Sequence, residues 1–150
     1  MEAFEQKILV RWSDLDPNNH VRHSAYYDYG AQARIACLYQ QGIGIDWLSR
    51  NGIGPVLFRE EAVFYRELRF HDQLIIDTKL SCVSADHRKW SIRHSIMRGD
   101  ELCAIITVDG AWIDLEKRRI VQPPPELIEK FEAGARTEDF QIIDSAKKQG

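Results

Sequence analysis

Residues 11–29 read RWSDLDPNNHVRHSAYYDY and join a predicted strand to a predicted helix. Two carboxylates, two histidines and two asparagines fall within residues 14–23 of this stretch. A loop that leads into a helix faces the free N–H groups and the positive dipole end of that helix. Such donors can hold a carbonyl oxygen that becomes anionic during acyl transfer, while a nearby carboxylate activates water or attacks directly. Asp, Asn and Pro also form ordinary turns and caps, so both interpretations stay open at this point.

The segment after this loop predicts a buried helix. Ser24 is the expected N-terminal cap, because its hydroxyl can accept from an orphan N–H of the first turn. From 25 to 38 nearly every residue is apolar or small, which is typical of a helix buried on all sides. Gly42 and Gly44 are expected to end the helix.

Most of the remaining chain predicts β structure. Short turns at 84–86 and 98–100 separate three long apolar segments, which indicates antiparallel hairpins. The first strand is expected to place Ile8, Val10 and Trp12 on one face. The expected strands are residues 4–12, 56–65, 74–83, 89–97, 102–114 and 119–122.

These elements predict one domain over residues 1–150. Its core spans about 4–122, and a C-terminal helix at about 126–133 with a polar tail makes up most of 123–150. A sheet that covers a single helix has to curl around it. One helix cannot cover both faces of a sheet, so we expect the other face or an edge to meet a second subunit.

Composition narrows the class of protein. The chain has 150 residues and a formal net charge of -3, which argues against nucleic acid as a partner. It contains no run of 18 apolar residues and no basic, apolar leader, so we expect a cytoplasmic protein outside the membrane. The three cysteines form no CxxC pair and are expected to be reduced and buried, and the sequence offers no metal-ligand set.

Four motifs carry a resemblance to a known family. Asp14-Leu15-Asp16-Pro17, His20-Val21, Tyr26 and Ala31-Gln32-Ala33-Arg34 resemble the hotdog-fold thioesterases of the 4-hydroxybenzoyl-CoA thioesterase type. The resemblance implies an α+β hotdog fold, in which a curled antiparallel sheet wraps a long central helix. It implies hydrolysis of an acyl-CoA or acyl-carrier thioester to a carboxylic acid and a thiol, with no metal or cofactor. It also implies a homodimer or a dimer of dimers (a homotetramer) with the site at the subunit interface.

The resemblance also implies roles for individual residues. Asp16, which precedes the proline, matches the catalytic carboxylate and would act as nucleophile or general base. Asn19 and His20 would organise the loop, and the side chain of Tyr26 would pack rather than react. The sequence departs from the family in having Arg22-His23 where many relatives have Asn-Asn, and Ala31 where some have a helical Glu. The expected oxyanion donors are backbone N–H groups among His23, Ser24, Ala25 and Tyr26.

Other polar residues have competing interpretations. Glu60 is either a second-site acid or a paired residue at a strand irregularity. His94 is expected to be a hydrogen-bonded core residue, and Asp109 a bulge or cross-strand partner. Arginine side chains suit the phosphates of CoA, although most are expected to be ordinary solvated charges. The basic residues considered for this role are Arg22, Arg59, Arg66, Arg69, Arg88 and Lys89.

Two other functions compete with thioester hydrolysis. A non-catalytic hotdog protein would bind an acyl thioester or lipid without cleaving it, which the missing helical Glu favours. A hotdog dehydratase would need a histidine facing the acyl chain, and only His20 or His23 is placed for that role.

Overall fold

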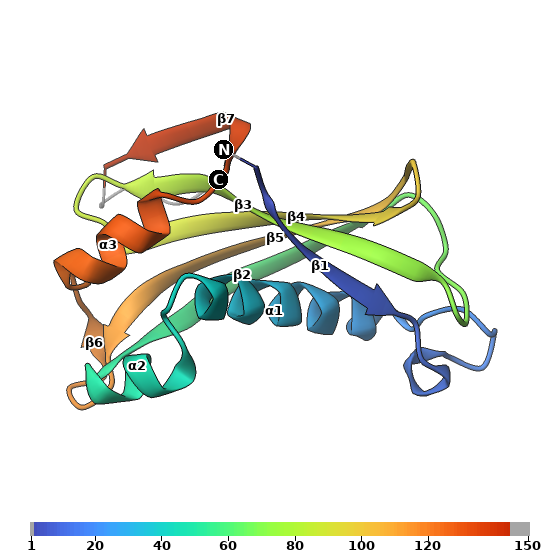
Figure 1. Cartoon of the computed structure of the whole chain (residues 1–150), viewed down its shortest axis with the longest axis horizontal. Helices are drawn as coiled ribbons and strands as arrows, with labels where there is room; N and C mark the ends of the chain where they lie inside the picture. The colour runs from blue at the N-terminus through green and yellow to red at the C-terminus, as the bar shows by residue number, and fades with distance from the viewer. Residues whose placement is uncertain (1, 145–150) are drawn as a thin grey trace.

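The computed structural model describes residues 2–144, which form a twisted antiparallel sheet with one long helix against it (Figure 1). The seven-stranded sheet has the order β1-β3-β4-β5-β2, with β6 beside β5 and β7 beside β3. The strands are β1 (Phe4–Leu9), β2 (Ile53–Phe64), β3 (Gln73–Ser84), β4 (Lys89–Arg98), β5 (Glu101–Asp114), β6 (Arg119–Ile120) and β7 (Arg136–Ile143). The helices are α1 (His23–Gln40), α2 (Ile45–Arg50) and α3 (Pro125–Glu132), with a short 3-10 turn at Trp12–Asp14.

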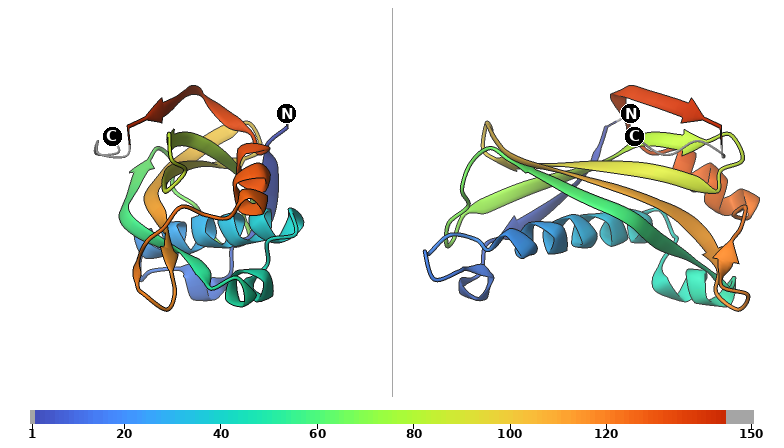
Figure 2. Two further views of the ribbon diagram at one scale, coloured as in Figure 1. Left: turned by 90° about the vertical axis from the view of Figure 1, so that its left-hand side faces the viewer. Right: turned by 180° about the vertical axis from the view of Figure 1, so that it is seen from behind.

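Buried residues alternate along the strands, so that one face of the sheet forms the hydrophobic core. Leu74, Ile76 and Leu80 of β3 are buried, and Ile96 of β4 pairs directly with Ile76. Because side chains alternate along a strand, each strand contributes every second residue to the side that faces α1. The expected curled antiparallel sheet against one long helix is therefore confirmed, and Figure 2 shows its curvature from two further directions.

Helix α1 is buried on one face rather than all round, so the expectation of complete burial is wrong for the single chain. Ala25, Tyr29 and Ala33 are buried, whereas Ala31 and Gln32 are exposed. The sheet of one chain reaches only one side of the helix, and small side chains there allow close packing. At Gly30 a Cβ would lie 3.3 Å from the ring of His94 and 3.4 Å from Ile106.

The first strand is shorter than expected and ends at Leu9. Val10 is buried and its N–H donates to the carbonyl of Asp72 at 2.9 Å, after which the chain enters the 3-10 turn. Trp12 was expected on the same face as Val10 but is 77% exposed, whereas Val10 is buried. The turn interrupts the period of two on which that expectation depended.

The C-terminal segment is more ordered than the predicted polar tail. The expected helix is confirmed as α3, and its Phe131 packs against Trp90 and Trp112. The chain then continues as β7, which runs parallel to the end of β3. Residues 145–150 of the expected tail lie outside the described residues.

Strand β2 forms a long open edge of the sheet. It pairs with β5 on one side, and its exposed side chains include Leu57, Phe58, Val63 and Phe64. Its register shifts between Leu57 and Arg59. A long apolar edge presents unpaired backbone groups that another strand can complete. Within residues 2–144, no helix is both long enough and apolar enough to cross a bilayer.

Candidate active site

Asp16 lies in a tight turn between the 3-10 turn and α1. Its Oδ1 accepts hydrogen bonds from the backbone N–H groups of Asn18 at 2.9 Å and His20 at 3.3 Å. The carboxylate is half-buried, and its Oδ2 has no hydrogen-bond partner within residues 2–144. One oxygen therefore fixes the side chain while the other remains available for chemistry.

The turn itself explains the residues around Asp16. The Asp16 N–H donates to the carbonyl of His20 at 2.8 Å, and Leu15 bridges to Val21 as a short antiparallel pair. Asn19 has φ 63°, a left-handed conformation that Asn adopts more readily than most residues. The role of Asn19 in organising the loop stays a prediction.

His20 connects this loop to the segment that follows β2. Its Nε2 lies 3.1 Å from Oε2 of Glu67, and its backbone bridges to Arg69. The neighbouring Val21 N–H donates to the carbonyl of Leu68 at 2.8 Å. The imidazole therefore has a carboxylate partner within its own chain.

Helix α1 begins at His23, one residue before Ser24, so the expectation that Ser24 caps it is wrong. Arg22 is the N-cap residue, with no side-chain cap. Arg22 is held by its N–H to the Asp14 carbonyl and by its guanidinium to the Ser13 carbonyl. The hydroxyl of Ser24 instead accepts from Nε of Arg22 at 3.1 Å. Because the loop is fixed at Arg22, the helix starts directly after it.

The four expected oxyanion donors are not equivalent. The Ala25 N–H donates to the Arg22 carbonyl at 3.0 Å and is therefore occupied. The N–H groups of His23 and Ser24 open the helix and have no intrahelical acceptor, since an α-helix leaves its first N–H groups unpaired. The ring of Tyr26 is buried, with its centroid 4.8 Å from that of Phe64 in an edge-to-face contact. Tyr26 packs as expected.

Asp14 is an organising residue that the sequence did not single out. It is buried and accepts hydrogen bonds from Arg11 and from the hydroxyl of Tyr29. Burial alone would raise the pKa of Asp14, but these hydrogen bonds outweigh it and hold the pKa below its usual value. Asp14 therefore ties the loop to the second turn of α1. The Asp14-Leu15-Asp16 motif indicates two carboxylates in the loop, but the sequence does not show which of them is buried.

Glu60 does not join the Asp16 loop. Its Oε2 lies 3.7 Å from a guanidinium nitrogen of Arg34, beside the register shift of β2. Asp109 accepts a hydrogen bond of 2.6 Å from Ser91 on the neighbouring strand, which confirms the expected cross-strand pair. Glu60 is thus a paired residue near a strand irregularity, in a different part of the chain from Asp16.

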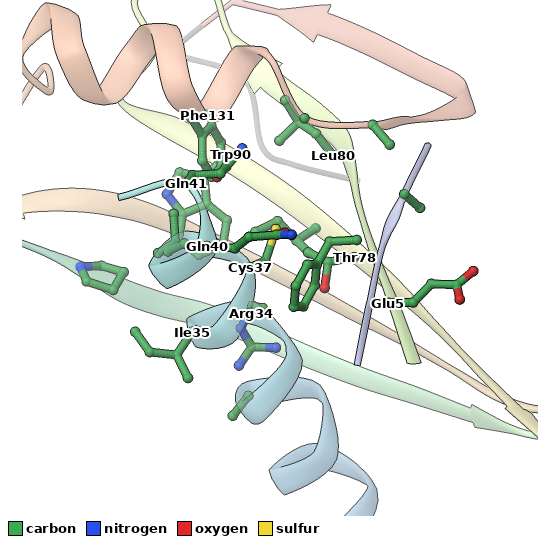
Figure 3. Close-up of a pocket in the computed structure, with 18 of the residues that line it drawn as sticks. Glu5, Arg34, Ile35, Cys37, Gln40, Gln41, Thr78, Leu80, Trp90 and Phe131 are labelled. Atoms are coloured by element: carbon green, nitrogen blue, oxygen red, sulfur yellow. The ribbon is translucent and has the colours of Figure 1, made fainter. Parts of the chain in front are cut away.

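A cavity of about 660 Å³ lies toward the C-terminal half of α1 (Figure 3). Its wall is mainly apolar and aromatic, with Arg34 and Thr78 among the polar members. Asp16 does not line this cavity. The apolar and aromatic wall residues include Leu38, Leu57, Leu80, Trp90, Ile92, Trp112 and Phe131.

Residues 2–144 contain no group of three His, Cys, Asp or Glu side chains placed to hold an ion. Cys37, Cys82 and Cys103 are free thiols, and Cys37 is half-buried rather than buried.

A curled antiparallel sheet packed against one long helix, with a polar loop at the start of that helix, defines a hotdog-fold protein. A sequence model of the thioesterase-like superfamily matches residues 10–131. The chain belongs to this superfamily, and the reaction class that membership supports is hydrolysis of a thioester.

Solved structures share the fold at low sequence identity. A Staphylococcus aureus protein in complex with CoA superposes with TM-score 0.82 at 16% identity, over 91% of this chain and 87% of that one. The 1,4-dihydroxy-2-naphthoyl-CoA thioesterase of Synechocystis superposes with TM-score 0.78 at 15% identity, over 88% of this chain and 97% of that one. The probable thioesterase YbaW of Escherichia coli superposes with TM-score 0.75 at 22% identity, over 86% of this chain and 96% of that one. At these identities the likeness concerns the fold.

Proposed function

We propose that the protein hydrolyses an acyl-CoA or acyl-carrier thioester, with Asp16 as its catalytic carboxylate. The observation that carries this proposal is the fixed Oδ1 and free Oδ2 of Asp16 in the loop that leads into α1. The CoA bound to one structural neighbour and the CoA ester named for another support CoA as the thiol.

The chemistry requires a nucleophile and a site for negative charge. Oδ2 of Asp16 either attacks the thioester carbonyl or removes a proton from water that attacks it. The carbonyl oxygen becomes anionic, and the N–H groups of His23 and Ser24 are placed at the positive end of α1 to receive it. Collapse of the tetrahedral species breaks the carbon–sulfur bond, and the sulfur leaves as a thiol after protonation. If Asp16 attacks directly, water then hydrolyses the resulting anhydride.

The proposed unit is a dimer formed through β2, either alone or within a dimer of dimers. The free side of β2 carries unpaired backbone groups, and four of its apolar side chains are exposed, namely Leu57, Phe58, Val63 and Phe64. Two copies related by a two-fold axis can pair these edges antiparallel. This arrangement closes the edge and covers Val63 and Phe64.

Such a dimer also brings the loop and the cavity together. The end of β2 contacts the first turn of α1 through Tyr26–Phe64 packing, and Arg69, just after β2, bridges to His20 of the Asp16 loop. The start of β2 contributes Pro55 and Leu57 to the cavity. Antiparallel pairing sets the end of one β2 beside the start of the other, so the Asp16 loop of one copy approaches the cavity of its partner.

The dehydratase alternative is less well supported. His20 is paired with Glu67, His23 is exposed, and neither lines the cavity. Binding without hydrolysis is separated from the proposal by activity measurements.

The test is thiol release from acetyl-, dodecanoyl- and benzoyl-CoA by the wild type and Asp16→Asn. Asn keeps an Oδ1 that can accept the two loop hydrogen bonds, so the turn is expected to survive. We expect turnover to fall about 100-fold or more, the scale of a lost acid–base group. Asp28→Asn is the control, because its carboxylate is exposed on α1. Equal rates for wild type and Asp16→Asn would remove Asp16 from the mechanism, and no release from any ester would favour the binding-only function.

A further inference from the structure

Two polar residues of the cavity wall, Arg34 and Thr78, are connected through His94, and no part of the proposed hydrolysis uses them. Glu2, Glu5, Gln40 and Gln41 also line the cavity. A guanidinium nitrogen of Arg34 lies 3.1 Å from Nε2 of His94, a residue 60 positions further along the chain. The other ring nitrogen of His94 lies 2.8 Å from the Asp77 carbonyl and 3.2 Å from the Thr78 hydroxyl. His94 is fully buried, and burial lowers its pKa to about 3, so it is neutral.

The hydrogen-bond partners fix the direction of these contacts. A carbonyl oxygen can only accept, so Nδ1 of His94 carries the proton and donates to Asp77. Nε2 then has a lone pair and accepts from Arg34. The Thr78 oxygen can share the Nδ1 proton only as an acceptor, which leaves its own hydroxyl proton free to donate.

Arg34 is left with unused donors. Its side chain is 13% exposed, and within residues 2–144 its partners are His94 and, at 3.7 Å, Glu60. A guanidinium has five N–H donors in a planar fork, which suits the two oxygens of a carboxylate. Burial removes part of the solvation that this cation would have in water, and the pKa of Arg34 is lowered for that reason.

The other end of the cavity suits an apolar chain. In Figure 3, Trp90, Leu80 and Phe131 lie at the end opposite Arg34. Phe131 comes from α3, and Gln41 holds that helix by donating to the Lys130 carbonyl at 2.8 Å. The Ala135 carbonyl accepts from the Leu80 N–H at 2.9 Å, so the chain after α3 is also fixed to the wall. Gly134 and Ala135 lie beyond the part of the chain that the superfamily model matches.

We propose that this cavity is a binding site for a free fatty acid. The carboxylate accepts hydrogen bonds from Arg34 and Thr78, and the alkyl chain lies between Leu80, Trp90, Trp112 and Phe131. The volume of about 660 Å³ falls within the range of roughly 300–1,000 Å³ that is common for small-molecule sites. Glu60 is the anion already beside Arg34, and it competes with the ligand for that cation.

The site does not depend on Asp16, so its failure and that of the proposed hydrolysis are distinguishable. A fatty acid is the kind of product that the proposed hydrolysis would release. Only this connection between the cavity and the reaction rests on the proposed function. Asp16→Asn is expected to bind dodecanoate as the wild type does, whatever its turnover.

The test is calorimetric titration of the full chain with dodecanoate, 1-dodecanol and dodecanoyl-CoA, using the Asp16→Asn protein to prevent turnover of the ester. We expect Arg34→Met to weaken dodecanoate binding about tenfold or more, the scale of a lost charge-assisted contact, and to leave dodecanol binding nearly unchanged. Glu60→Gln is expected to tighten dodecanoate binding, because it removes the competing anion. Gln32→Met is the matched control, since Gln32 is exposed on the same helix and does not line the cavity.

Two further variants keep the proposal testable if Arg34→Met is poorly folded. Thr78→Val removes the second donor and is expected to weaken dodecanoate binding, whereas Ala135→Trp is expected to obstruct the cavity for both dodecanoate and dodecanol. No dodecanoate binding by the wild type would overturn the proposal. Equal losses of acid and alcohol in Arg34→Met would also overturn it, because the carboxylate would then not lie at Arg34. Binding of dodecanoyl-CoA alone would assign the cavity to the ester rather than the acid.

Discussion

The hydroxyl of Tyr29 donates a 2.8 Å hydrogen bond to Oδ2 of Asp14, and both residues are buried. This bond joins the loop that carries Asp16 to the second turn of α1. Burial and the contact with Asp14 raise the pKa of Tyr29, so the phenol stays protonated and remains a donor. The position of Asp16 therefore depends on a carboxylate two residues before it and on a tyrosine 15 residues beyond that carboxylate.

Tyr29→Phe is expected to lower the free energy of unfolding by about 1–3 kcal/mol, since it leaves a buried, charged acceptor without one of its donors. Urea denaturation at pH 7.5 measures this change. Tyr27→Phe is the control, because Tyr27 is only partly buried on the same helix. An equal effect of the two substitutions would show that the bond to Asp14 contributes little.

Stability is expected to fall as the pH is lowered from 6.5 toward 3, because of His94. The folded protein keeps His94 neutral, with a pKa of about 3, whereas the unfolded chain takes up a proton near its ordinary pKa of 6.5. The unfolded state therefore binds more protons in this window, and acid favours unfolding. Between pH 7.5 and 5 the loss is about 2 kcal/mol. Urea titrations at both pH values should show a smaller difference for His94→Gln than for wild type or His23→Gln, and an unchanged difference would contradict the assignment.

Gly110→Ala is expected to destabilise the sheet strongly. A Cβ at Gly110 would lie 2.5 Å from both a ring carbon of Trp90 and the carbonyl oxygen of Val56. The backbone oxygen cannot move without disturbing the β2–β5 pairing, so we expect a loss of about 3 kcal/mol or more. Thermal unfolding compared with Gly134→Ala, where the nearest atom is 3.4 Å away, measures the effect. Similar melting temperatures for the two variants would show that the site relaxes at little cost.

Val63→Lys is expected to shift the protein toward monomer and to reduce thioester hydrolysis with it. A lysine at this position places a charged ammonium group in the proposed β2–β2 contact and opposes burial of the strand edge. Light scattering after size-exclusion chromatography over a range of concentrations measures the shift. Ile142→Lys is the control, because Ile142 is 62% exposed on β7. A wild type that is monomeric at every concentration would contradict the proposed dimer.

The positions of most helices and strands could be predicted from the sequence, because local periodicity reports which residues face the core. Strands β3, β4 and β5 and helix α3 lie within one or two residues of their expected bounds. The predictions of these bounds were wrong where a helix or strand begins or ends because of contacts with distant residues, which the neighbouring sequence does not reveal. Trp12 is exposed because it lies in the 3-10 turn, and α1 begins before Ser24 because hydrogen bonds fix Arg22. Strand β7 forms because it pairs in parallel with β3.

The sequence by itself determined the order of the elements, the polar loop before the long helix and the free thiols, since each depends on residue type and short-range spacing. Only the tertiary structure decided that Asp14 is buried while Asp16 keeps a free oxygen, and that Arg34 meets His94 beside an apolar cavity. Those relationships join residues far apart in the chain. Their energies depend on which side chains the folded sheet brings within hydrogen-bonding distance, and no periodic pattern along the sequence records that distance.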